Sequence, residues 1–437
     1  MKATLKLDFD VIVVGAGLTG FAAAIGASKL GMKTLLVEST GVIGGLAVNG
    51  LVNPFMKYDY AGEDLIQGVF SELIERLKKV GDYVGRAFNY EALKYHLVNL
   101  LKENRVNILL YTQIIDLQIV EKKIQKIIGS AAGQRLEIRG KQFIDCTGDA
   151  ALGKLAELTL LIGDEQSRQN QAVTQIFVLD NVQLNKTMEY VQQHPDDFFS
   201  WVSPQQKDIA ISVAGFFKLV EQAIEDGMDL PRDHFFFIQL PEKTSVTVNT
   251  GHISITDANS PLAVSAAQLT GLEQTHQLTA FAQKYLPGFE DCCLRQSAAQ
   301  IGIRESARIK GKYIFQQSDV TDFNKFPDAV VKAIYGVDIH QNQDEPSVKE
   351  VVLNYTDYYE IPARALIAAE LDNLLMAGRN LSADFGGQSA VRIMPTCCGT
   401  GQGAGVIAAL AALTGRKPAD ITAAEFQAEL KKQGANL

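Results

Sequence analysis

The sequence predicts an α/β fold in which a Rossmann-like nucleotide-binding domain is split by an inserted α+β domain. Three observations indicate this: a βαβ pattern over residues 9–38, extended runs over 107–148, and a second buried strand, "NLLMAG", that ends at Gly378. Strands that are apolar without alternation are typical of sheets covered on both faces. A chain of 437 residues is also too long for one ordinary core. We therefore predict the nucleotide-binding domain at residues 1–165 and 370–437, and a cap or substrate domain at 166–369.

Composition and charge restrict the partners. The chain carries 41 basic and 50 acidic side chains, a formal charge of −9, which disfavours nucleic acid as a partner. The longest apolar candidate, "GVIAALAALTG", is shorter than the roughly 18–20 residues that cross a bilayer, so we expect no membrane span. The N-terminal apolar run leads into a glycine motif, which favours a buried strand over a signal peptide. We expect a cytoplasmic protein, and the oligomeric state is left open.

The first glycine motif carries the strongest functional signal. The strand "DVIVVG" leads into Gly15, Gly17 and Gly20, spaced G-x-G-x-x-G, and the next strand, "KTLLVE", ends at Glu38. In such a unit the first glycine forms a tight turn, the second lets the backbone approach a pyrophosphate, and the third lets helix and strand pack closely. An acidic residue about 20 positions later accepts from a ribose 2′-hydroxyl. The combination predicts a bound dinucleotide without a 2′-phosphate.

Motifs farther along the chain indicate which dinucleotide is bound. "GVIGGLA" follows Glu38, and later come "FIDCTGDAALGKLA", "IGIRESARIKGKYIF", "VDIH", "YYEIPARAL" and "NLLMAGRN…VRIMPTCCGTGQGAGVIAALAAL". Together they resemble a bacterial FAD-dependent oxidoreductase family with a FAD-binding fold of the glutathione reductase type. That family is similar to the fumarate reductase and succinate dehydrogenase flavoproteins. The resemblance extends over most of the chain and is sparse between about residues 165 and 290.

The resemblance implies FAD as the cofactor and assigns residues to its parts. Gly15, Gly17, Gly20 and Glu38 would hold the ADP portion. The other implied contacts are Gly44, Gly45 and Ala47 along the pyrophosphate and flavin edge, Ile114 at adenine through its backbone, Thr147, Gly148 and Asp149 on the adenosine side, and Gly378 and Arg379 at the pyrophosphate and ribityl chain. For Gly148 and Gly378 the alternative is ordinary strand termination.

Few protein groups are needed for chemistry, because a flavin carries out the redox step itself. We predict Arg304, His340 and Arg392 as the catalytic residues, since each lies in a motif that matches the family. The planar guanidinium of Arg392 suits a substrate carboxylate or the negative charge of reduced flavin. His340 can exchange a proton beside hydride transfer. An ion-paired loop for Arg304 and a hydrogen-bonded turn for His340 are the alternatives.

The stretch "IMPTCCGTGQGAGVIAALAAL" at residues 393–413 combines adjacent cysteines with a glycine-rich turn. Neither Cys397–Cys398 nor Cys292–Cys293 has C-x-x-C spacing, so we predict no metal site and no dithiol step. We expect a helix to begin near Thr400. By the resemblance, its free amides would point at the flavin C2 carbonyl and N1. The predicted cofactor contacts in this helix are Gly401 and Gln402.

We therefore predict an FAD-dependent oxidoreductase that transfers a hydride between flavin N5 and a small polar organic substrate bound between the domains. The alternatives are a flavin-binding module or subunit without turnover of its own, and a flavoenzyme that takes electrons from NAD(P)H. The sequence has no second G-x-G-x-x-G motif, which disfavours a separate NAD(P)H site. The substrate, the electron donor or acceptor and the direction of reaction are left open.

Overall fold

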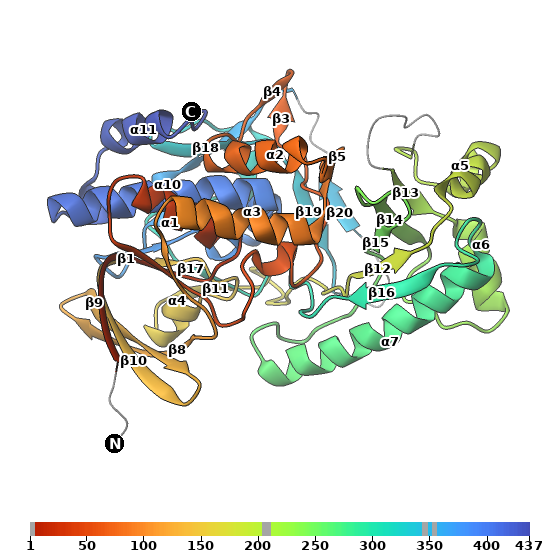
Figure 1. Cartoon of the computed structure of the whole chain (residues 1–437), viewed down its shortest axis with the longest axis horizontal. Coiled ribbons are helices and arrows are strands. Elements are labelled where there is room, and N and C mark those ends of the chain that lie inside the picture. Colours follow the sequence, from red (N-terminus) through yellow and green to blue (C-terminus); the bar gives the residue numbers. More distant parts are fainter. Residues whose placement is uncertain (1–4, 203–210, 343–347, 352–355) are drawn as a thin grey trace.

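The computed structural model describes residues 5–202, 211–342, 348–351 and 356–437. The stretches 1–4, 203–210, 343–347 and 352–355, which belong to the predicted domains, lie outside the described residues. The main sheet has the strand order β7–β2–β1–β10–β9–β8, with β22 beside β10 (Figure 1). Its strands are β1 (Leu5–Val14), β2 (Thr34–Val37), β7 (Asn107–Leu109), β8 (Gln113–Val120), β9 (Lys123–Ala131), β10 (Gln134–Asp145) and β22 (Leu374–Met376).

The predicted βαβ unit at the N-terminus is confirmed. Strands β1 and β2 are parallel, and helix α1 (Leu18–Ser28) connects them. Side chains of a strand alternate between its two faces: Val11 and Val13 enter one hydrophobic core, and Ile12 and Val14 enter another. Both faces of β1 are therefore covered, which explains why this strand is apolar without alternation.

The extended runs at 107–148 also form strands, as predicted. Strands β8, β9 and β10 make an antiparallel meander, while β10 is parallel to β1 and to β22. The strand that precedes Gly378 thus returns to the N-terminal sheet from more than 200 residues away. One core over this sheet contains side chains from α1, α2 (Val69–Lys79), α3 (Tyr90–Glu103), α10 (Met394–Thr414) and α11 (Ala423–Lys432).

The inserted part has a sheet and a core of its own. The strand order is β13–β14–β15–β12–β16, and the core centres on Phe235, Phe237, Phe281 and Phe289. The sheet lies with helices α5–α7 at the right of Figure 1. The bounds are β12 (Phe177–Asp180), α5 (Leu184–Gln193), β13 (Ser212–Gly215), α6 (Phe217–Glu225), β14 (Phe235–Gln239), β15 (Val246–Val248), α7 (Pro261–Tyr285) and β16 (Cys293–Ser297).

The segment after β16 returns to the first core. Buried side chains between Phe315 and Ile367 pack with those of α1 and α10. The predicted boundary between residues 369 and 370 stays a prediction, although the core of the inserted sheet draws only on residues before β17. The elements outside that sheet are α4 (Ala151–Leu155), β11 (Leu160–Ile162), β17 (Ala307–Ile309), α8 (Gln317–Thr321), β18 (Ala329–Ala333), β19 (Val337–His340), β20 (Val348–Val351), β21 (Tyr359–Pro362) and α9 (Phe385–Val391), with the hairpins β3 (Asp59–Tyr60)–β4 (Glu63–Asp64) and β5 (Tyr83–Val84)–β6 (Ala87–Phe88).

Helix α10 differs from the prediction. It begins at Met394, not near Thr400, because Pro395 fits the first turn, where its missing N–H is not needed. The glycines that suggested a turn instead allow close helix packing: a Cβ on Gly401 would overlap the carbonyl oxygen of Thr19 in α1. Among the described helices, α10 is long and apolar enough to cross a membrane. However, 83% of its most apolar window is buried inside the fold, as in a core helix.

Candidate cofactor and active site

The first glycine loop has three different steric requirements. Gly15 has φ +95°, and a Cβ there would lie 2.7 Å from the carbonyl oxygen of Cys146. A Cβ on Gly20 would overlap the carbonyl oxygen of Gly15, so this glycine allows helix and strand to pack. A Cβ on Gly17 would meet only the Cα of Gly45, at 3.9 Å. The position expected at the pyrophosphate is therefore open on its free side.

A second glycine loop lies against the first. Gly44 and Gly45 have φ +124° and +54°, values that favour glycine. The N–H of Gly44 donates to the carbonyl oxygen of Ala16 at 2.8 Å, and a Cβ on Gly45 would lie 2.8 Å from the Cα of Gly17. Buried Ala47 ends the short 3-10 turn that follows, Gly45–Ala47. The two loops predicted to hold the phosphates are thus adjacent.

Glu38 fastens the end of β2 to the glycine loop. Its Oε2 accepts from the N–H of Ala16 and its Oε1 from the N–H of Thr40, both at 2.8 Å. The carbonyl oxygen of Glu38 accepts from the N–H of Thr112 at 2.9 Å, which brings the start of the Ile114 strand to the same edge. The contacts of Glu38 with ribose and of Ile114 with adenine stay predictions.

The motif after β10 meets the motif after β22. Arg379 forms an ion pair with Asp149, Nη2 to Oδ1 at 2.8 Å. A Cβ on Gly148 would overlap this guanidinium, so the glycine makes the ion pair possible. Burial acts to raise the pKa of Asp149, but Arg379 and a hydrogen bond from Ser306 outweigh it and lower the pKa. Gly148 therefore does more than end a strand.

Other contacts bind these motifs to the core. Gly378, with φ +81°, lies over the side chain of Thr19. Thr147 donates through its hydroxyl to Asp145 at 2.6 Å, so its side chain holds the turn after β10. The roles of Gly378 and Thr147 at the cofactor stay predictions.

Buried polar atoms without a partner test whether the site fits FAD. Six of them lie within residues 379–396: Arg379 Nη1, Asn380 Oδ1, Ser382 Oγ, Gln388 Oε1, Arg392 Nε and Thr396 Oγ1. A buried polar atom without a hydrogen bond costs about 1–3 kcal/mol, so such a concentration indicates a polar ligand. The open face of Gly17 and this set together fit a dinucleotide that extends from the glycine loops toward the start of α10.

Two of the three predicted catalytic residues, His340 and Arg392, contact one carboxylate, Asp338. His340 Nε2 lies 3.0 Å from Asp338 Oδ1, and Arg392 Nη2 lies 3.2 Å from Asp338 Oδ2. Asp338 and His340 are both in β19, two positions apart, where side chains share a face; Arg392 caps the C-terminus of α9. We assigned no role to Asp338 from the sequence, although its spacing from His340 was a usable signal.

Arg304 acts on Asp338 electrostatically, and its hydrogen bonds go to other residues. Its Nη1 donates to the carbonyl oxygen of Ala172 at 2.7 Å and to Thr174 Oγ1 at 2.9 Å. Gln388 Nε2 donates to the carbonyl oxygens of Arg304 at 3.1 Å and of Arg379 at 3.4 Å. One side chain thus connects the catalytic cluster to the pyrophosphate motif.

The loop that contains Arg304 does hold an ion pair, but other residues form it. Arg308 and Glu305 are both buried, with Nη1 and Oε1 3.8 Å apart. The alternative of an ion-paired structural loop therefore describes these two residues and not Arg304.

Electrostatics sets the charges of the cluster. Burial, and then Arg392, lower the pKa of Arg304 to about 9. Burial and Arg304 lower the pKa of His340 to about 4, although Asp338 opposes them. Burial acts to raise the pKa of Asp338, but His340, Arg392 and Arg304 hold it well below its usual range. At neutral pH the cluster therefore contains charged arginines, one carboxylate and a neutral imidazole.

The tautomer of His340 follows from this charge state. An ionised carboxylate only accepts hydrogen bonds, so Nε2 of His340 carries the proton and donates to Asp338. Nδ1 is left with its lone pair, and it is buried without a partner. The cluster thus presents one free proton acceptor between two guanidinium groups.

The cysteines and the middle of α10 have structural surroundings. Cys397 donates to the carbonyl oxygen of Arg392 at 3.1 Å, and burial raises the pKa of its thiol to about 12. Gln402 accepts from the N–H of Val69 at 3.2 Å, where α2 begins. The free amides of α10 belong to its first turn at Met394, so the free-amide argument for Gly401 and Gln402 is wrong. No cluster of three His, Cys, Asp or Glu side chains suited to a metal occurs among the described residues.

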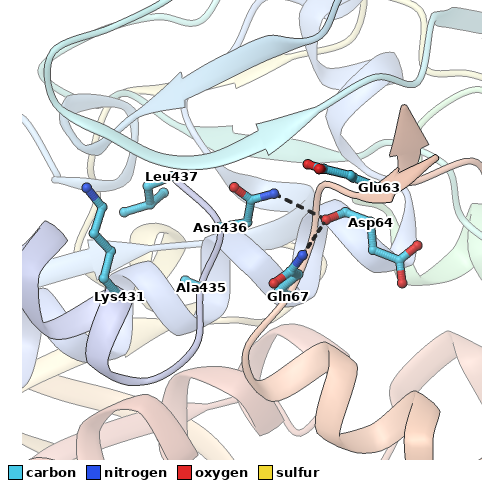
Figure 2. Close-up of a pocket in the computed structure, with 7 residues that line it drawn as sticks. All are labelled: Glu63, Asp64, Gln67, Lys431, Ala435, Asn436 and Leu437. Atoms are coloured by element: carbon cyan, nitrogen blue, oxygen red, sulfur yellow. Dashed lines mark hydrogen bonds between the residues drawn. The ribbon is translucent and has the colours of Figure 1, made fainter. Parts of the chain in front are cut away.

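A surface hollow lies elsewhere, between the β3–β4 hairpin and the end of the chain. Figure 2 shows the side chains of Gln67 and Asn436 directed at the carbonyl oxygen of Asp64, with hydrogen bonds of 2.9 and 3.3 Å. The remaining lining residues are Glu63, Lys431, Ala435 and Leu437. None of the predicted site residues lines this hollow.

A dinucleotide cradle beside a mostly buried Arg–Asp–His cluster is the arrangement expected of an oxidoreductase that depends on a nucleotide cofactor. The profile of one such family, described as FAD dependent oxidoreductase, matches residues 10–430. The chain belongs to this family. FAD is therefore its cofactor, as predicted.

Individual relatives are distant. The chain is 31% identical over 161 residues to mitochondrial dihydrolipoyl dehydrogenase of Schizosaccharomyces pombe, a match that covers 34% of this chain and 29% of that protein. It is 27% identical over 179 residues to dihydrolipoyl dehydrogenase of Staphylococcus aureus, covering 36% and 38%. The matched regions thus span less than two fifths of either relative.

A solved structure supports the fold over the whole chain. A geranylgeranyl bacteriochlorophyll reductase-like protein of Thermoplasma acidophilum aligns with a TM-score of 0.50 at 13% identity, covering 98% of this chain and 83% of that one. Similarity at this identity concerns the fold alone, and it confirms the predicted Rossmann-type architecture.

Proposed function

We propose that this protein transfers a hydride between FAD and a small polar organic substrate that carries an anionic group. The observation that supports the proposal is the cluster of Arg304, Asp338, His340 and Arg392, in which His340 Nδ1 is a buried acceptor without a partner. Such an acceptor beside two guanidinium groups suits a substrate that must be both oriented and deprotonated.

The proton acceptor is His340. When bound, FAD would supply a two-electron acceptor for the hydride of a substrate C–H bond. The proton of the adjacent O–H or N–H group goes to His340 Nδ1, and the substrate becomes a C=O or C=N compound. Asp338 stabilises the imidazolium that forms, because its carboxylate lies 3.0 Å from Nε2. In the opposite direction the imidazolium returns the same proton.

The guanidinium groups position the substrate. Arg392 retains a buried Nε without a hydrogen bond, which gives it a donor for a substrate carboxylate. Arg304 is held by Ala172 and Thr174 on one side. Orientation of this kind can account for several kcal/mol of a catalytic barrier, since it replaces a chance encounter with a fixed geometry.

The first test is flavin content and reactivity. Purified protein, incubated with FAD and desalted, should show a bound flavin spectrum. A panel of 2-hydroxy acids and secondary amines, added without oxygen, should bleach that spectrum in the wild type. The His340→Gln variant should bleach much more slowly while it retains FAD. Absence of bound flavin, or equal bleaching by both proteins, would contradict the proposal.

A further inference from the structure

Arg232 is a half-buried cation that the inserted part contributes. It lies between α6 and β14, and no carboxylate forms an ion pair with it among the residues that the structure describes. Its Nη2 donates to His252 Nδ1 at 3.3 Å. The neighbouring Asp233 is largely exposed and pairs with His234 at 2.7 Å. Burial lowers the pKa of Arg232, with Asp233 opposing the shift.

A short chain of contacts connects Arg232 to the active site. Arg304 Nη1 donates to Thr174 Oγ1, which donates in turn to the carbonyl oxygen of Gly251, each at 2.9 Å. The next residue is His252, the partner of Arg232. Beside these residues, Val173 and Ile253 form an antiparallel β-bridge, so the backbone holds the two ends of this chain of contacts together. Arg232 therefore belongs to the electrostatic surroundings of Arg304.

The charges of this region do not balance. Arg392 and Arg232 both act on Arg304 as like charges. Asp338 is the carboxylate that acts on Arg304 and Arg392, while Arg232 is opposed only by the largely exposed Asp233. His340 is neutral at pH 7 because its pKa is about 4. Among the groups that are not exposed, Arg232, Arg304 and Arg392 carry three positive charges and Asp338 carries one negative charge, so two positive charges are in excess. Buried charge of one sign is unfavourable unless a counter-charge binds there.

We infer that the substrate carries two anionic groups, of which Arg304 and Arg392 bind one and Arg232 binds the other. This inference rests on the proposed function, which requires only one anionic group. Arg232 is then a residue that determines specificity, and it acts from the inserted part, whereas the proton acceptor lies in β19. The substrate class is a small organic dianion.

Anion binding to the FAD-loaded protein tests this inference. The probes are malonate, glutarate and adipate as dianions, and acetate and butyrate as monoanions, followed by calorimetry and by the spectrum of the bound flavin. At constant ionic strength, at least one dianion should bind about tenfold or more tightly than either monoanion, because a second charge-assisted contact adds to the first. Arg232→Gln should remove that preference and leave the monoanions within about twofold, an effect expected of a local contact.

Matched variants separate the inference from the proposed function. Arg232→Lys should recover part of the preference for dianions, since it restores the charge. Arg295→Gln changes a half-exposed arginine of the same part, paired with Asp180 and Glu242, and should bind all probes as the wild type does. Arg392→Gln should weaken every probe.

Three results would overturn the inference. The first is an equal fall in affinity for dianions and monoanions in the Arg232→Gln variant. The second is that this variant binds all probes as the wild type does. The third is that the wild type shows no preference for dianions. If Arg392→Gln nevertheless weakens acetate, the proposed function stands and only the second anionic group is excluded. If no probe binds at all, the anionic part of the proposed function fails as well.

Discussion

Replacing Asp338 by asparagine removes the one carboxylate to which the active-site cluster is joined. The carboxylate contacts His340 at 3.0 Å and Arg392 at 3.2 Å, and it accepts from Tyr335 at 3.2 Å. Both partners of the ion pair are mostly buried: the side chains of Asp338 and Arg392 are each 15% exposed. Loss of one partner from a buried ion pair costs about 3–5 kcal/mol, because the other charge is left without compensation. We expect the free energy of unfolding of Asp338→Asn to fall by about that amount.

Urea denaturation at pH 7, followed by circular dichroism on the FAD-loaded protein, measures this change. The matched control is Asp328→Asn, which breaks a pair with the half-exposed Arg364, Nε to Oδ2 at 2.9 Å. An exposed pair contributes about 0–1 kcal/mol. Comparable losses in the two variants, or a loss below about 1 kcal/mol in Asp338→Asn, would refute the view that Asp338 compensates buried arginines. NMR of histidine should also show the pKa of His340 falling, since Asp338 acts to raise it.

Three other predictions follow from the described contacts. Gly401→Ala would drive a methyl group into the backbone of Thr19 and should lower the free energy of unfolding by about 1–3 kcal/mol. Gly403→Ala should lower it less, because its methyl group would meet a valine side chain at 2.8 Å. Equal urea midpoints for the two variants would contradict this. Cys397→Ser should keep FAD and most activity, because the thiol pKa of about 12 excludes a thiolate; loss of turnover with FAD retained would restore a thiol mechanism. The pKa of His340 falls on folding from 6.5 to about 4, so stability is lost as the pH falls from 6.5 toward 4, because the unfolded chain takes up the proton first. Relative to the His340→Gln variant, the free energy of unfolding of the wild type should fall by up to about 1.4 kcal/mol per pH unit in that window. Parallel curves of unfolding free energy against pH for the two proteins would disprove this.

Local patterns were sufficient to predict the cofactor half of the molecule. The strand, glycine loop and helix from Leu5 to Ser28 form as predicted, because each glycine answers a constraint from its near neighbours or from one adjacent strand. The motif at Gly378 was predictable for a similar reason, since a buried strand that ends in glycine has few places in a parallel sheet. Motifs were enough to identify Arg304, His340 and Arg392, but they did not predict which contacts these side chains make in the fold.

The start of α10 shows where local patterns mislead. Glycines in the middle of a helix weaken it by roughly 1 kcal/mol each, so the run at 399–405 predicted a turn before the helix. In the structure Gly401 and Gly405 lie against the backbone of α1, where any larger residue would keep the helices apart. Tertiary packing therefore outweighs the low helix propensity.

The sequence alone determined the nucleotide cradle, because it depends on short spacings along the chain, and the resemblance of its motifs to a known family implied the family and the cofactor. Only the tertiary structure decided that Asp338 joins His340 to Arg392, that Gln388 connects this cluster to Arg379, and that the charge of Arg232 acts on Arg304 from the inserted part. The physical reason is distance along the chain. Charges far apart in sequence acquire their pKa values and partners only when folding buries them together, and no local pattern encodes that burial.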